Sequence, residues 1–174
     1  RDPKYVIRKP SFDDPNFWNQ IKPQVQQQVS YYAGSGPSMY ELRDELSIGR
    51  FASPMDYCFD PNTLREFRVW LQGVYGSLDA LNQEWETSFT SWDNVVPMTT
   101  YAVKDRERAA LAGGKPENYA PWADHRAYMD ISFNRALDRL RGYVHEIDPT
   151  RPVGVEGMQM PSAWGGYDLW RMSQ

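Results

Sequence analysis

Strand-like and helix-like patterns alternate along this chain, and their order restricts the folds that it can adopt. Apolar residues spaced three or four apart predict helices that begin near residues 15, 61, 78 and 121. Shorter runs at residues 5–11, 38–47 and 153–157 are typical of β-strands. No internal repeat or low-complexity tract interrupts this order. The alternation predicts an α/β fold with parallel strands, either an open sheet or part of a barrel.

Short local signals define the ends of the predicted helices. Asp14 and Asp60 each precede a proline, which is typical of a helix N-cap followed by the first helical position. We expect Gly76 to end the second helix and Ser77 to cap a short third one. Pro23 lies inside the first helical pattern, so we expect a kink or the end of a segment there.

One stretch departs from the alternation. Residues 87–120 are largely polar, contain glycines and prolines, and exceed the length of an ordinary connection in a compact domain. We expect an irregular excursion or a functional loop there, within one domain that includes residues 1–174. Beyond it, Pro121 opens a long helical pattern that contains His125 and His145. Neither histidine has metal-ligand spacing to a Cys, Asp or Glu motif, so both are expected at the surface or in packing.

Composition and charge exclude several kinds of partner. The 174 residues are 41% hydrophobic and 24% charged, as in one globular domain or part of a larger one. With a net charge of -4 and no cluster of basic residues, the chain is not expected to bind nucleic acid. No apolar run approaches the roughly 18 residues of a membrane span, so no membrane partner is expected. The first residues, "RDPKYVIRKP", predict a start inside a longer protein, and both a cytoplasmic and a secreted location stay open.

Aromatic residues are abundant and cysteine is scarce. The chain contains seven Trp and eleven Tyr, whose flat faces and polar edges suit stacking against sugar rings. Core filling is the alternative, and it is the better interpretation for any single Trp. With Cys58 as its one cysteine, the chain can form neither an internal disulfide nor a Cys-rich zinc site.

The predicted strand in "YELRDELSIG", residues 40–49, carries an unusual number of charges. Glu41, Arg43, Asp44 and Glu45 all lie within it, although charge in a strand interior is costly. The carboxyl ends of strands face the active-site mouth in a parallel α/β barrel, so Asp44 and Glu45 are candidates for chemistry. Strand alternation puts Glu41, Arg43 and Glu45 on one face. An edge strand with one solvated face is the alternative.

A second carboxylate and an aromatic residue follow the next strand. Glu156 in "PVGVEGMQ" lies at the carboxyl end of that strand, as Asp44 and Glu45 do in theirs. Glycoside hydrolysis requires two carboxyl groups, and these strand ends could supply them. The alternative is a solvated loop carboxylate beside Gly157. Trp164 in "PSAWGGYDLW" also follows the strand end and could stack on a sugar face, with ordinary packing as the alternative.

One long run resembles a known family. The run "FDPNTLREFRVWLQGVYGSLDALNQEWETSFTSWDNVVP" is similar to the segment after the acid/base strand in the family 42 glycoside hydrolases, which are β-galactosidase-like (β/α)8 barrels. The residues that carry the resemblance are Phe67, Arg68, Trp70, Leu71, Tyr75, Gly76, Leu78, Leu81, Asn82, Trp85, Phe89 and Trp92. The resemblance implies an internal fragment of one catalytic TIM-barrel domain, from about the end of strand 3 to the start of strand 6. It also implies a carbohydrate substrate.

The resemblance also implies roles for individual residues. Glu45 takes the position of the general acid/base, and Asp44 stands where the family usually has the asparagine that holds the sugar 2-hydroxyl. An aspartate only accepts hydrogen bonds, and its charge would raise the pKa of Glu45 beside it. Glu156 and Trp164 are expected to contact substrate. The nucleophile, a glutamate at the end of strand 7 in this clan, is expected beyond Gln174.

The function implied by the resemblance is that of a retaining glycoside hydrolase. These 174 residues alone are expected to be inactive, because the second carboxylate and several strands would be missing. A non-catalytic carbohydrate-binding or scaffold barrel is the alternative, motivated by the aspartate at position 44. Some family members hold zinc with a cysteine cluster, but "DYCFDP" keeps only Cys58, so no metal and no cofactor are predicted. The sequence specifies neither the sugar and linkage nor the oligomeric state.

Overall fold

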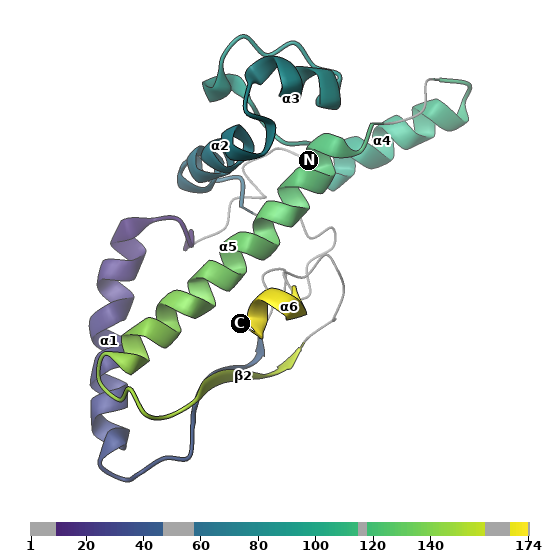
Figure 1. The fold of residues 1–174 in the computed structure, drawn as a ribbon. Coiled ribbons are helices and arrows are strands. Elements are labelled where there is room, and N and C mark those ends of the chain that lie inside the picture. The colour runs from purple at the N-terminus through teal and green to yellow at the C-terminus, as the bar shows by residue number, and fades with distance from the viewer. Residues whose placement is uncertain (1–9, 47–57, 115–117, 159–167, 174) are drawn as a thin grey trace. The chain divides into compact units, whose positions relative to one another are not determined.

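The computed structural model describes residues 10–46, 58–114, 118–158 and 168–173. Its elements, most of which are labelled in Figure 1, are α1 (Pro15–Ala33), β1 (Tyr40–Leu46), α2 (Pro61–Tyr75), α3 (Leu78–Trp85), η2 (Trp92–Asn94), α4 (Thr100–Leu111), α5 (Ala120–His145), β2 (Val153–Met158) and α6 (Leu169–Met172). The described residues form two compact units. Unit 1 contains α2, α3, η2, α4 and α5 up to Met129, and unit 2 contains α1, β1, the rest of α5, β2 and α6.

Unit 2 contains a parallel two-stranded sheet. Tyr40 of β1 lies opposite Val153 of β2, and the register continues to the pair formed by Leu46 and Met158, with one irregularity on the way. Because the strands are parallel, both end at the same edge of the sheet. The alternation of helix and strand that predicted an α/β fold with parallel strands is confirmed.

The predicted starts of the first three helices are confirmed by their N-caps. The Asp14 side chain accepts a hydrogen bond from the backbone N–H of Asn16, and the Ser77 side chain caps α3 in the same way. Asp60 accepts from two backbone N–H groups at the start of α2. The alternative that the first segment ends at Pro23 is wrong, because α1 continues to Ala33. Pro23 is exposed, so water can reach the carbonyl that its ring leaves without a donor.

The run that carries the family resemblance forms the core of unit 1. Its buried cluster contains Phe67, Leu71, Leu81, Trp85, Val95 and Tyr128, and several other members of the run pack against this cluster. The polar members bind backbone: Arg68 Nε donates to the carbonyl of Val95 at 2.9 Å, and the Asn82 side chain donates to and accepts from the backbone of Phe89. The residues that carry the family resemblance therefore pack α2 and α3 together, and they do not include the candidate catalytic residues.

Two regions differ from their predictions. The irregular excursion expected over residues 87–120 contains the helix α4, which Thr99 caps and which buries Val103. Its polar sequence suggested a loop, but Ala, Lys, Arg and Glu are good helix formers and suit an exposed helix. Near the C-terminus, where the start of a strand was expected, Asp168 caps the short helix α6. Most of the strand expected at residues 5–11 lies outside the described residues.

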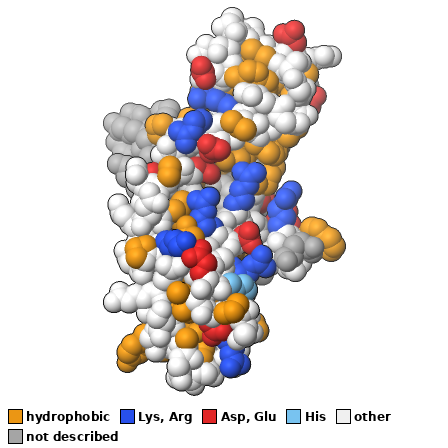
Figure 2. All heavy atoms as spheres, turned by 60° about the vertical axis from the view of Figure 1, so that its left-hand side comes forward, with side chains coloured by type: hydrophobic (Ala, Val, Ile, Leu, Met, Phe, Trp, Pro, Cys, Tyr) orange, Lys and Arg blue, Asp and Glu red, His pale blue; other side chains and the backbone are white. Residues whose placement is uncertain are grey.

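Hydropathy and charge in the described part of the chain bear on the expectations from the sequence. Within residues 10–46, 58–114, 118–158 and 168–173, no helix is long and apolar enough to cross a membrane. Figure 2 shows acidic and basic side chains intermingled with uncharged ones on the visible face.

Candidate active site

The carboxyl ends of β1 and β2 bring two of the candidate residues together. Asp44 and Glu156 are register partners, and neighbouring strands lie about 4.8 Å apart. Both side chains are exposed. Glu45 is the next residue of β1 and precedes Leu46, the last residue of the strand. The two strands can be followed to this common edge in Figure 1.

The two faces of the sheet differ in character. Leu42 is half-buried and lines a space between the sheet and α5, whereas Glu41 and Arg43 are exposed. In a (β/α)8 barrel the helices cover the outside of the sheet, and the opposite face lines the interior. The register irregularity lies between Glu41 and Asp44, and such irregularities re-aim side chains. Apolar packing under α5 and charge on the other face agree with a barrel segment.

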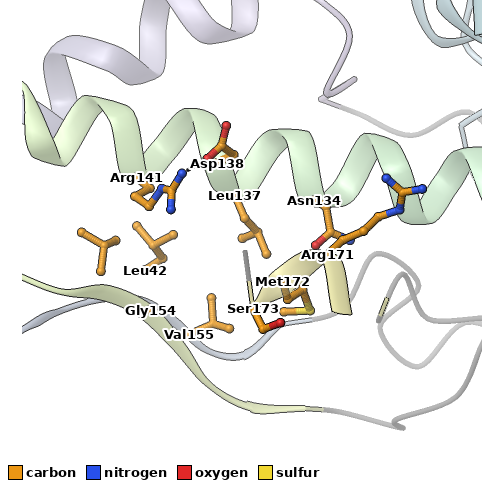
Figure 3. A pocket seen from close by; sticks show the side chains of 11 residues that line it. Leu42, Asn134, Leu137, Asp138, Arg141, Gly154, Val155, Arg171, Met172 and Ser173 are labelled. Atoms are coloured by element: carbon orange, nitrogen blue, oxygen red, sulfur yellow. Dashed lines mark hydrogen bonds and ion pairs between the residues drawn. The ribbon is translucent and has the colours of Figure 1, made fainter. Parts of the chain in front are cut away.

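The cavity in Figure 3 lies on the helix-covered face and is not the candidate site. It has a volume of about 250 Å³ and lies between the sheet, α5 and α6. Leu42, Leu137, Val155 and Met172 supply apolar wall. Asp138 and Arg141 at its rim pair with each other. A cavity with these walls on the outside of the sheet is a gap in packing between strand and helix layers.

The side chains of the two other candidate residues, Glu45 and Trp164, are not described by the structure. Trp164 lies outside the described residues, and for Glu45 the structure describes the strand position alone. The predicted roles of Glu45 and Trp164 therefore stay predictions. Residues 47–57, which follow β1 in the sequence, also lie outside the described part of the chain.

His125 is a packing residue, as one of the two alternatives predicted. It is fully buried, and the centroids of the Phe59 and Phe67 rings lie 4.5 and 5.7 Å from the centroid of its imidazole ring. Burial, together with the charge of Arg126, lowers the pKa of His125 from 6.5 to about 3. The imidazole is therefore neutral at ordinary pH. His145 is half-buried, and its Nε2 lies 3.1 Å from the carbonyl oxygen of Arg151.

The structure describes no arrangement of ligands for a metal. Cys58 is buried, and its carbonyl oxygen lies 3.4 Å from Nε2 of His125. Among the described residues, no group of three or more His, Cys, Asp or Glu side chains is placed to hold a metal ion. The absence of zinc from the stretch Ser47–Asp60 stays a prediction, because residues 47–57 lie outside the described part of the chain.

Sequence reasoning missed one carboxylate that organises unit 1. Oδ2 of Asp124 on α5 accepts hydrogen bonds from the Tyr75 hydroxyl at 2.6 Å and from Trp85 Nε1 at 2.8 Å. Burial and this carboxylate raise the pKa of Tyr75, so its phenol stays protonated and donates. The sequence could have suggested such a residue, because the hydroxyl of a buried Tyr and the indole N–H of a buried Trp need hydrogen-bond partners. Asp124 therefore links α2, α3 and α5, and it is not one of the candidate catalytic residues.

Comparisons with known protein families identify one that covers most of this chain. The family model for glycoside hydrolase family 42, described as beta-galactosidase, matches residues 16–174. Beta-galactosidase BgaP from Planococcus sp. (strain L4) is 42% identical over 45 residues, which are 23% of this chain and 7% of that protein.

Solved structures of the same family share the fold. The apo exo-carrageenase of glycoside hydrolase family 42 from Bacteroides ovatus has a TM-score of 0.72 and 18% identity, covering 94% of this chain and 22% of that one. A beta-galactosidase from Bacillus circulans sp. alkalophilus has a TM-score of 0.62 and 20% identity, covering 86% of this chain and 21% of that one.

This chain corresponds to a small part of the solved structures that it resembles. The chain spans about a fifth of each solved structure, and it corresponds to part of the TIM-barrel catalytic domain. At 18% and 20% identity, the structural likeness shows the fold alone. The family model covers nearly the whole chain, and it is this match that identifies the family. The chain belongs to the beta-galactosidase family of glycoside hydrolases, family 42.

Proposed function

We propose that this chain carries the acid/base part of the active site of a retaining, β-galactosidase-like glycoside hydrolase. One observation supports the proposal most strongly. Asp44, which directly precedes Glu45, lies opposite Glu156 where two parallel strands end. Carboxyl groups at that edge of a TIM barrel are placed for chemistry, and the family supplies the reaction class.

Glu45 acts twice in this proposal. Protonated Glu45 gives its proton to the glycosidic oxygen as the nucleophile attacks the anomeric carbon and the bond to the leaving group breaks. The sugar is then covalently bound to the nucleophile. Ionised Glu45 next removes a proton from a water molecule that attacks the anomeric carbon, which releases the sugar and restores both carboxyl groups.

Neighbouring residues orient the sugar. Asp44 accepts a hydrogen bond from the 2-hydroxyl, and Glu156 accepts one from another hydroxyl, as exposed carboxylates can. Trp164 stacks on the sugar face. The nucleophile is proposed to lie outside these 174 residues, because the chain spans about a fifth of the solved family members.

The stereochemistry of the product tests this proposal. Proton NMR of the full-length protein acting on an aryl β-galactoside should show the β-anomer of galactose first, with the α-anomer growing later by mutarotation. Early appearance of the α-anomer would rule out the retaining mechanism. A full-length protein that binds β-galactosides but cleaves none would favour the non-catalytic alternative, in which Asp44 marks the loss of activity.

A further inference from the structure

We draw no further inference here: the strongest candidate, the buried polar side chains of Asp60 and His125 in unit 1, each with one atom that has no hydrogen-bond partner among the described residues, adjoins Cys58, where residues 47–57 outside the described part of the chain end, so nothing in the structure shows what these two atoms contact.

Discussion

Asp44 and Glu156 face each other across two neighbouring parallel strands, although 112 residues separate them in the sequence. Both are exposed, and Glu45 directly follows Asp44. The register places these two carboxylates side by side at the point where both strands end.

Asp44→Asn in the full-length protein should move the basic limb of the kcat/KM profile to lower pH. The substitution removes a negative charge beside Glu45, so the ionised form of Glu45 becomes less costly and the acid is lost at lower pH. The amide still reaches the 2-hydroxyl, so activity at the new optimum should stay within about tenfold of wild type. An unchanged basic limb would show that Asp44 does not influence the acid.

The isolated 174-residue chain should hydrolyse no aryl glycoside. It lacks the proposed nucleophile, and among its described residues the sheet has two strands, which leaves strand edges unpaired. The measurement is release of nitrophenol by the purified chain. Turnover that disappears in Glu156→Gln would instead identify Glu156 as the nucleophile.

Protonation of His125 should destabilise unit 1 in acid. Its pKa is about 3 in the folded protein and 6.5 in the unfolded chain, so below pH 6.5 the unfolded state takes up a proton that the folded state does not. Stability is therefore lost as the pH falls from about 6.5 towards 3, by up to about 1.4 kcal/mol per pH unit. His125→Leu should flatten this dependence in urea titrations of the full-length protein between pH 6 and pH 4.

A neighbouring substitution provides the control for His125. Met129 is buried one helical turn further along α5, and Met129→Leu removes no titrating group. This variant should keep the wild-type dependence of stability on pH, with a uniform cost below about 1.5 kcal/mol. Equal slopes for His125→Leu and wild type would refute the role of the imidazole.

Asp124→Ala should cost more stability than Tyr75→Phe. Removing the carboxylate leaves the buried indole N–H of Trp85 without its acceptor, with an expected loss of about 2–3 kcal/mol. Tyr75→Phe removes one donor and leaves the bond from Trp85 to Asp124 intact, so a loss of about 1 kcal/mol is expected. The free energies of unfolding from chemical denaturation of the full-length variants decide this order. A larger loss for Tyr75→Phe than for Asp124→Ala would contradict it.

The features that sequence predicted correctly are local. Asp60 and Ser77 cap helices through atoms two or three residues away, so their identity and position are sufficient to place the helix starts. The carboxyl-end positions of Asp44 and Glu156 followed from the order of strands and helices and are confirmed by the register. Their roles in binding are untested.

The features that sequence did not predict depend on distant contacts or on solvent. Asp124 meets Tyr75 across 49 residues, and no local pattern identifies that partner. The first helical segment could have ended at Pro23, but the exposed position of that residue, which sequence periodicity leaves open, allows α1 to continue to Ala33. The α4 helix was missed because a helix that buries little apolar surface has no strong hydrophobic period.

Glu45→Gln in the full-length protein tests most directly whether Glu45 is the general acid/base. Glutamine keeps the shape of the side chain but has no proton to transfer, so substrates with poor leaving groups should react about 10² to 10⁴ times more slowly. An activated aryl β-galactoside needs no protonation, so its glycosyl-enzyme should form and then persist. Azide needs no base, and it should restore turnover and yield the β-galactosyl azide. Equal losses for good and poor leaving groups, without rescue by azide, would show that Glu45 is not the acid/base.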